Sequence, residues 1–235
     1  MTDGVYFRQL LSGRDFAVGD PIATQMVNFS YLIGDAASRE AVVVDPAYAP
    51  GDLLDILAAD DMRLTGVLVT HHHPDHVGGD LMGHPLSGLA ELLGTAPVPV
   101  HVHRDEAEWV RRGTGVSATD LTAHEHDDLL QVGAVPIRLL HTPGHTPGSQ
   151  CFLVADRLIA GDTLFLQGCG RTDFPGGDPD AMYASLQQLA RLIGNPVVHP
   201  GHQYSEEPAA SLIHVRRTNV VFRPRSVEEF RMAFG

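Results

Sequence analysis

Residues 64–80 read LTGVLVTHHHPDHVGGD, an apolar run that leads directly into a cluster of polar side chains. The spacing His-x-His-x-Asp-His places four potential metal ligands within six residues: His71, His73, Asp75 and His76. Neutral imidazoles and carboxylates are suitable ligands for zinc, iron or manganese. Because the loop is kinked by Pro74 and followed by two glycines, its side chains are able to point toward more than one centre.

Two further loops carry histidines in the same position, directly after an apolar strand. Residues 135–141 (VPIRLLH) lead into His145, and residues 195–202 (NPVVHPGH) end at His202. Seven of the 14 histidines fall in these three loops: His71, His72, His73, His76, His141, His145 and His202. Strand ends in α/β proteins often carry functional side chains, so the pattern predicts one shared site.

Taken singly, several of these residues also have a structural interpretation. Asp75 could cap a helix, His145 could be a turn histidine that donates to the backbone, and Asp162 could hold an Asx turn. A purely structural interpretation requires five polar strand-end residues to coincide in one chain. The sequence therefore favours a functional site.

The rest of the chain alternates strands and helices. Strands are predicted at residues 26–35, 40–47, 64–70, 98–103, 135–141, 149–155, 157–162 and 195–202. Helices are predicted at residues 51–62, 104–112, 180–193 and 226–234, the third with Met182, Leu186, Leu189 and Ile193 on one face. The pattern indicates an α/β fold in a single domain, residues 1–235, with a polar tail at 205–235.

Composition narrows the class of protein and its partners. The 235 residues are 43% hydrophobic and 19% charged, as in ordinary folded domains. A formal net charge of −13 disfavours a nucleic-acid partner, and the absence of a long apolar run disfavours a membrane partner. Only Cys151 and Cys169 are present, and residues 1–16 lack a signal-peptide pattern, so we expect a cytoplasmic protein.

The ordered motifs H-x-H-x-D-H, G-H-T-P-G, G-D-T-L-F and P-G-H closely resemble those of the metallo-β-lactamase superfamily. The resemblance implies an αββα sandwich, in which two mixed β-sheets face each other and helices flank them. It also implies two divalent metal ions, with zinc expected and iron or manganese as alternatives. By the family pattern, the first metal takes His71, His73 and His145, the second takes Asp75, His76 and His202, and Asp162 bridges them.

A binuclear site of this kind implies a hydrolase. A divalent metal lowers the pKa of bound water to near 7, and the resulting metal-bound hydroxide attacks a carbonyl. The metals also stabilise the oxyanion that develops. Asp75 is the predicted catalytic residue, because it is placed to orient the nucleophile or to accept its proton.

Residues 161–178 (GDTLFLQGCGRTDFPGGD) are similar to a region of glyoxalase II enzymes and of persulfide dioxygenases. The first class hydrolyses S-acyl thiols such as S-lactoylglutathione. The second oxidises a low-molecular-weight thiol persulfide with one iron, for which His73, His145 and Asp162 would be the ligands. Because residues 75–79 (DHVGG) look more like a hydrolase, we expect a glyoxalase II-like thioester hydrolase, with the dioxygenase as the alternative.

The substrate is expected to be a small-molecule thiol conjugate, with the carrier thiol left open. Glyoxalase II has a long helical C-terminal domain that binds glutathione, whereas a short tail follows His202 here. Arg171 is the predicted substrate-binding residue, and an ion pair with Asp173 or Asp178 is the alternative. The two cysteines are expected to be packed side chains and not nucleophiles. The arginines of residues 205–235 are expected to be solvent-exposed. Residues 220–222 (VVF) either form a contact in a homo-oligomer or pack on the core as a strand.

Overall fold

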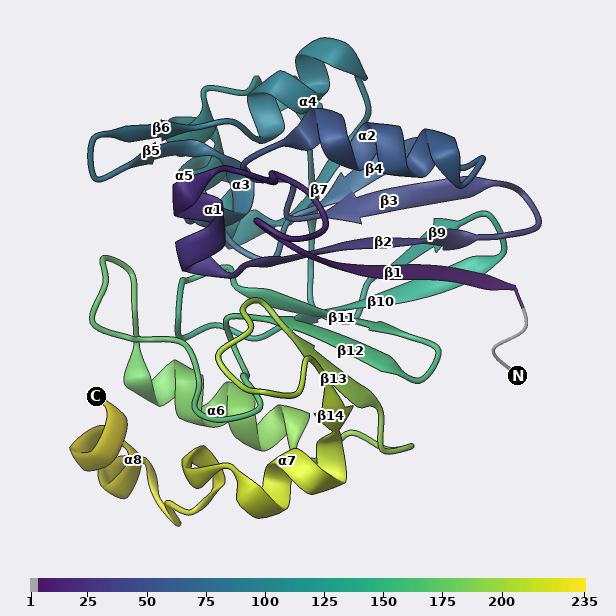
Figure 1. Ribbon diagram of the computed structural model, residues 1–235. Helices are drawn as coiled ribbons and strands as arrows, with labels where there is room; N and C mark the ends of the chain where they lie inside the picture. Colours follow the sequence, from purple (N-terminus) through teal and green to yellow (C-terminus); the bar gives the residue numbers. More distant parts are fainter. Residues whose placement is uncertain (1–3) are drawn as a thin grey trace.

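The computed structural model describes residues 4–235, which form two facing six-stranded sheets (Figure 1). The first sheet has the order β1-β2-β3-β4-β7-β8. Its strands are β1 (Val5–Leu11), β2 (Phe29–Asp35), β3 (Glu40–Val44), β4 (Arg63–Leu68), β7 (Val100–His103) and β8 (Leu121–His124). Three of its pairings, from β3 to β8, are parallel and the other two are antiparallel, so the sheet is mixed.

The second sheet has the order β14-β13-β12-β11-β10-β9 and is also mixed, since β12 and β13 pair in parallel. Its strands are β9 (Leu129–Val132), β10 (Val135–His141), β11 (Gln150–Val154), β12 (Arg157–Gly161), β13 (Val197–Pro200) and β14 (Ala210–Ser211). A separate hairpin is formed by β5 (Gly79–Leu81) and β6 (His84–Leu86).

Helices cover the outer face of each sheet (Figure 1). The helices that precede β10 are α1 (Pro21–Met26), α2 (Pro50–Ala59), α3 (Pro74–Val77), α4 (Leu89–Thr95), α5 (Arg104–Thr114) and the 3-10 turn η1 (Ala118–Asp120). Those that follow β12 are α6 (Pro179–Leu189), α7 (Leu212–Thr218), the 3-10 turn η2 (Val220–Phe222) and α8 (Val227–Phe234). The predicted αββα sandwich is therefore confirmed.

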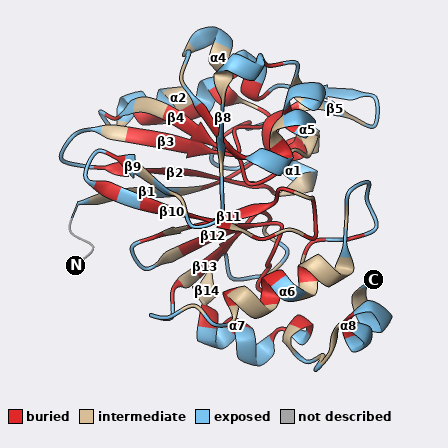
Figure 2. Cartoon of the chain, turned by 180° about the vertical axis from the view of Figure 1, so that it is seen from behind, coloured by how far each residue is buried: buried red, intermediate tan, exposed pale blue. Residues whose placement is uncertain are grey.

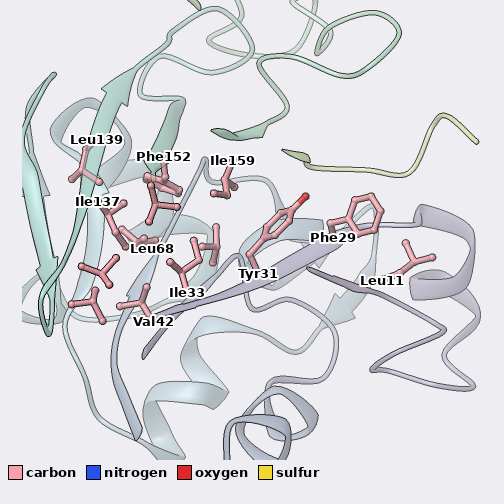
Figure 3. Close-up of a cluster of buried hydrophobic side chains, with 14 residues drawn as sticks. Leu11, Phe29, Tyr31, Ile33, Val42, Leu68, Ile137, Leu139, Phe152 and Ile159 are labelled. Carbon is pink, nitrogen blue, oxygen red and sulfur yellow. The ribbon is translucent and has the colours of Figure 1, made fainter. Parts of the chain in front are cut away.

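One large hydrophobic cluster of the core lies between the two sheets (Figure 3), and others lie between the sheets and the helices. Tyr31, Ile33 and Val42 of the first sheet pack against Phe152 and Ile159 of the second. Figure 2 shows the central strands largely buried and the helices exposed on their outer faces. Because both faces of the sheets are covered, a strand such as β3 is buried over residues 41–44, which explains its apolar run AVVV.

The C-terminal elements correct two details of the sequence analysis. Helix α6 ends at Leu189, so Ile193 lies outside it and is 95% exposed instead of joining the apolar face. Residues 220–222 form a 3-10 turn and not a strand, with Val221 buried and Val220 exposed. Among residues 4–235, no helix has the length and apolar character needed to cross a membrane.

Candidate metal centre

The three histidine loops and Asp162 meet at one end of the sandwich. His71 follows β4, Asp162 follows β12, and His202 follows β13, while His145 lies on the loop between β10 and β11. The short helix α3 begins at Pro74 and directs Asp75 and His76 into the same region. Strands from both sheets thus position the predicted ligands, which are far apart in the sequence.

The side chains form groups whose ligand atoms lie within 4.8 Å of one another. His71, His73 and His145 make one group, and Asp75, His76 and His202 make another. These are the two triads that the family pattern implied. Asp75 lies in the first turn of α3 and is not the residue that caps it.

Asp162 contacts both groups. One of its carboxylate oxygens, Oδ2, is 3.7 Å from His145 Nε2 and 3.4 Å from His202 Nε2. The other, Oδ1, is 3.4 Å from His76 Nε2. Gly201 permits this approach, because a Cβ atom there would lie 2.2 Å from Asp162 Oδ1. The position of Asp162 is that of a residue shared by two ligand groups.

Three of the imidazoles form a hydrogen bond through Nδ1, which leaves Nε2 facing the centre. His76 Nδ1 lies 2.8 Å from Asp45 Oδ2, His145 Nδ1 lies 2.7 Å from the carbonyl oxygen of Arg171, and His202 Nδ1 lies 2.8 Å from that of Met26. These oxygens only accept hydrogen bonds, so each Nδ1 is the donor. Such contacts fix the tautomer and orientation of metal-binding histidines.

Three of the atoms that face the centre lack hydrogen-bond partners. His71 Nε2, His145 Nε2 and Asp162 Oδ1 are buried and make no hydrogen bond within residues 4–235. His76 Nε2 and His202 Nε2 lie 3.3 Å apart, and both rings already donate through Nδ1. Because buried acceptors that face one another are costly, this donor set fits divalent cations.

The pKa values of the histidines differ between the two ligand groups. Burial lowers the pKa of His71 well below its ordinary value, and that of His73 to about 3, so both rings are neutral ligands near neutral pH. Burial opposes charge at the other group too, but Asp162 and Asp75 outweigh it and raise the pKa of His76 and His202. The group of Asp75, His76 and His202 therefore favours positive charge.

The same balance acts on the two carboxylates. Burial raises the pKa of Asp75 and Asp162, but the neighbouring His76 and His202 rings more than offset it, so both values lie below the ordinary range. Both aspartates are ionised near neutral pH. Two negative charges beside the neutral rings of His71 and His73 make a binding site for a divalent metal.

Sequence reasoning missed two residues that support this site. Asp45 follows β3 and accepts hydrogen bonds from His76 and from the Thr70 backbone and hydroxyl. The signal was a carboxylate directly after an apolar strand, as at Asp162. Asn28 donates to Asp75 Oδ2 at 3.2 Å and is itself held by the hydroxyl of Tyr48, at 2.7 Å. Nothing in the sequence around Asn28 indicated its role.

Aromatic side chains lie at the partly exposed edge of the candidate centre, which is called its rim below. Of the histidines in the two triads, only His73 is half-buried, and the ring of Phe174 lies 5.6 Å from it, edge to face. Tyr204 stacks on His202 with ring centroids 4.7 Å apart and is 55% exposed. Trp109 stacks on His72. These rings give the rim an apolar character.

The remaining predicted residues have clear places. Arg171 is exposed, forms a two-point ion pair with Asp173 and lies over the ring of Phe174. Its predicted alternative, a pair with Asp173, is therefore present. Burial raises the pKa of the Cys169 thiol to about 12 and that of Cys151 to about 11, as expected for packed thiols and not for nucleophiles.

An αββα sandwich with histidines and aspartates gathered at one end is typical of metallohydrolases. The sequence model of the metallo-beta-lactamase superfamily matches residues 23–202 of this chain, a range that includes every predicted ligand. The chain belongs to the metallo-beta-lactamase superfamily.

Named relatives refine this placement. A hydroxyacylglutathione hydrolase of Pseudomonas paraeruginosa is 36% identical over 87% of this chain and 73% of the relative. The probable polyketide biosynthesis zinc-dependent hydrolase BaeB of Bacillus velezensis is 30% identical over 86% of this chain and 85% of its own length. The crystal structure of ETHE1 from Myxococcus xanthus superposes with a TM-score of 0.77 at 30% identity, covering 96% of this chain and 88% of that one. The chain is thus similar to the glyoxalase II-like and ETHE1-like branch of the superfamily.

Proposed function

We propose that this protein is a metal-dependent hydrolase that cleaves S-acyl thiols, with two divalent metal ions and zinc as the expected metal. The observation that carries the proposal is that two ligand groups share Asp162. The hydroxyacylglutathione hydrolase and zinc-dependent hydrolase relatives support the same class of reaction.

The residues that would hold the metals are those of the two groups: His71, His73 and His145 for one, Asp75, His76 and His202 for the other, and Asp162 for both. A divalent metal, when bound, lowers the pKa of water and polarises a carbonyl oxygen. The lowered pKa of Asp75 keeps it ionised. We infer that Asp75 orients a water by accepting its hydrogen bond, while Asn28 fixes the direction of that carboxylate.

The rim residues fit a thiol conjugate with an apolar part. Phe174 and Tyr204 are both partly exposed beside the ligand histidines, so they offer apolar surface to an acyl chain or to the thioether stem of the thiol. Arg171, on the same loop as Phe174, brings a positive charge to the rim. We propose that it contacts an anionic group of the carrier thiol.

A second function, persulfide dioxygenase, is supported by one specific observation. His73, His145 and Asp162 form a two-histidine, one-carboxylate subset of the site, with the rings of the two histidines 4.6 Å apart. This is the ligand type used by mononuclear iron oxygenases. The hydrolase remains our first proposal because residues 75–79 (DHVGG) look more like those of a hydrolase.

The experiment that separates the two functions is a side-by-side assay of one metal-loaded preparation. S-lactoyl thiols are tested for thiol release and thiol persulfides for oxygen uptake, with the metal content of the same sample measured. Thioester turnover with more than one metal equivalent per chain is expected. One iron per chain together with oxygen uptake on a persulfide would instead establish the dioxygenase.

A further inference from the structure

The side-chain amide of Asn28 faces the second ligand group, which consists of Asp75, His76 and His202. Its nitrogen, Nδ2, lies 3.2 Å from Asp75 Oδ2, 3.3 Å from His76 Nε2 and 3.4 Å from His202 Nε2. Asn28 is 3% exposed, so these contacts are made away from solvent. One buried amide thus contacts a ligand atom of every member of the group.

The direction of this amide is fixed at both ends. The Tyr48 hydroxyl, which is also buried, donates to Asn28 Oδ1 at 2.7 Å. At the other end, Asp75 Oδ2 is an acceptor. His76 and His202 each donate through Nδ1, so in the neutral form, which binds a metal, their Nε2 atoms are acceptors too. Three acceptors therefore face the two protons of Nδ2, and a reversed amide would place Oδ1 against all three.

The amide nitrogen stands where a fourth ligand atom would stand. Asp75 Oδ2 lies 3.6 Å from His76 Nε2 and 3.3 Å from His202 Nε2, and the two Nε2 atoms are 3.3 Å apart. Together with Asn28 Nδ2, these atoms form a nearly regular tetrahedron. Its centre is about 2 Å from each corner, the distance at which zinc binds nitrogen and oxygen. Three corners offer lone pairs to a cation, but the fourth offers N–H protons.

The first ligand group, which contains His71 and His145, differs in this respect. Their Nε2 atoms are buried and make no hydrogen bond within the described residues 4–235. A cation bound to them replaces no hydrogen bond. A cation at the second group, in contrast, takes the acceptors away from Asn28 and leaves the amide protons buried and facing a positive charge. Asn28 therefore opposes a cation at the second group alone.

We propose that Asn28, held in place by Tyr48, competes with the second metal and lowers the affinity of the second ligand group for it. The proposal rests on the two-metal function proposed above. In the metal-free chain the amide satisfies the buried acceptors and keeps them in position, and in the loaded chain its protons weaken the hold of the group on the cation. Asn28 is thus a positioning residue that sets how readily the protein passes between a one-metal and a two-metal form.

The test is a zinc titration of the full metal-free chain against a chromophoric chelator, which gives the affinity for each equivalent without substrate. Asn28→Ala and Tyr48→Phe are expected to bind the second equivalent about tenfold more tightly than the wild type, the effect of one hydrogen bond to a charged group. Tyr48→Phe keeps the amide but frees it to turn Oδ1 toward the cation. Tyr183→Phe, which removes the hydroxyl of a half-buried tyrosine of α6, is the matched control and is expected to bind as the wild type does.

The sign of the change separates this role from a purely supporting one. If Asn28 only supported Asp75, Asn28→Ala would bind the second equivalent more weakly, and this result or an unchanged affinity would overturn the proposal. Tyr48→Phe decides in the same way if Asn28→Ala does not fold. In a His73→Ala background, with the first group impaired, the tighter binding is expected to persist, and its loss would contradict the role of Asn28. A single zinc equivalent in the wild type and in every variant would overturn the two-metal function itself, and this proposal with it.

Discussion

Glu106 accepts two hydrogen bonds from His72 through a single carboxylate oxygen. Oε1 lies 2.8 Å from the backbone nitrogen of His72 and 2.5 Å from its ring Nδ1. The other oxygen, Oε2, accepts the backbone N–H of Gly148 at 2.7 Å, and the whole side chain is buried. One carboxylate of α5 therefore ties the loop that carries His71 and His73 to the loop that carries His145.

Removing this carboxylate is expected to destabilise both loops. Glu106→Ala leaves the donors on His72 and Gly148 buried without an acceptor, which costs about 1–3 kcal/mol of unfolding free energy. Urea unfolding measures the loss, and metal affinity at the candidate centre is expected to fall with it. Glu91→Ala, which removes an exposed glutamate of α4, is the control and is expected to change neither quantity. An unaltered unfolding midpoint in Glu106→Ala would show that the bridge does not support the loops.

Asp75→Asn is expected to lower thioester turnover sharply and to leave the fold intact. The amide still reaches Asn28 but no longer supplies a negative charge to His76 and His202, so the second ligand group holds a cation more weakly. Turnover, metal content and circular dichroism are measured together on one preparation. Asp55→Asn, an exposed carboxylate of α2, serves as the control. Turnover near that of the wild type would contradict the two-metal mechanism.

The Arg171–Asp173 ion pair at the rim of the candidate centre gives two variants with opposite expected effects. Arg171→Ala removes the positive charge and is expected to raise KM for an anionic thioester more than it lowers kcat. Asp173→Asn leaves Arg171 without its partner, so the guanidinium is free for substrate and KM is expected to fall. Steady-state kinetics at low ionic strength compare the two. Equal KM values for both variants would assign Arg171 to structure.

The predictable part of this protein is the part that local sequence encodes. The apolar strand before His71, the paired strands around Asp156 and the helix capped by Ser226 each carry their own periodicity or capping signal, and the structure confirms them. The end of α6 was missed because Ile193 keeps the helical spacing, while the backbone turns away four residues earlier. Apolar spacing alone does not indicate where a chain leaves its helix.

The ligands of the candidate centre were predictable because each follows an apolar strand, and strand ends of one sandwich meet. Their supporting residues were harder to predict. Asn28 holds Asp75 only because Tyr48, from a different loop, fixes the amide in place. Glu106 is an ordinary acidic residue in a helix until the fold buries it against His72. Contacts of this kind depend on the tertiary arrangement and leave no local pattern.

The last prediction concerns a buried histidine of β13 and the dependence of stability on pH. His199 lies 4.9 Å from the ring of Phe7 and hydrogen-bonds Gln9 through Nδ1, and burial, reinforced by Arg157, lowers its pKa to about 4. The unfolded chain binds this proton near pH 6.5 and the folded chain does not. The unfolding free energy is therefore unaffected above about pH 6.5 and falls as the pH drops toward 4, by roughly 1.4 kcal/mol per unit of pKa difference.

His199→Gln removes this proton from the linkage while keeping a polar side chain opposite Gln9. The difference in urea midpoint between about pH 7 and about pH 5 is expected to be smaller in the variant than in the wild type. Because both proteins carry the same candidate metal centre, any loss of metal at low pH affects both, and the comparison isolates His199. His214→Gln, an exposed position, is expected to keep the full pH dependence. If His199→Gln keeps the full pH dependence as well, His199 is protonated at low pH in the folded chain as it is in the unfolded chain. Its burial between Phe7 and Tyr31 would then not oppose the positive charge.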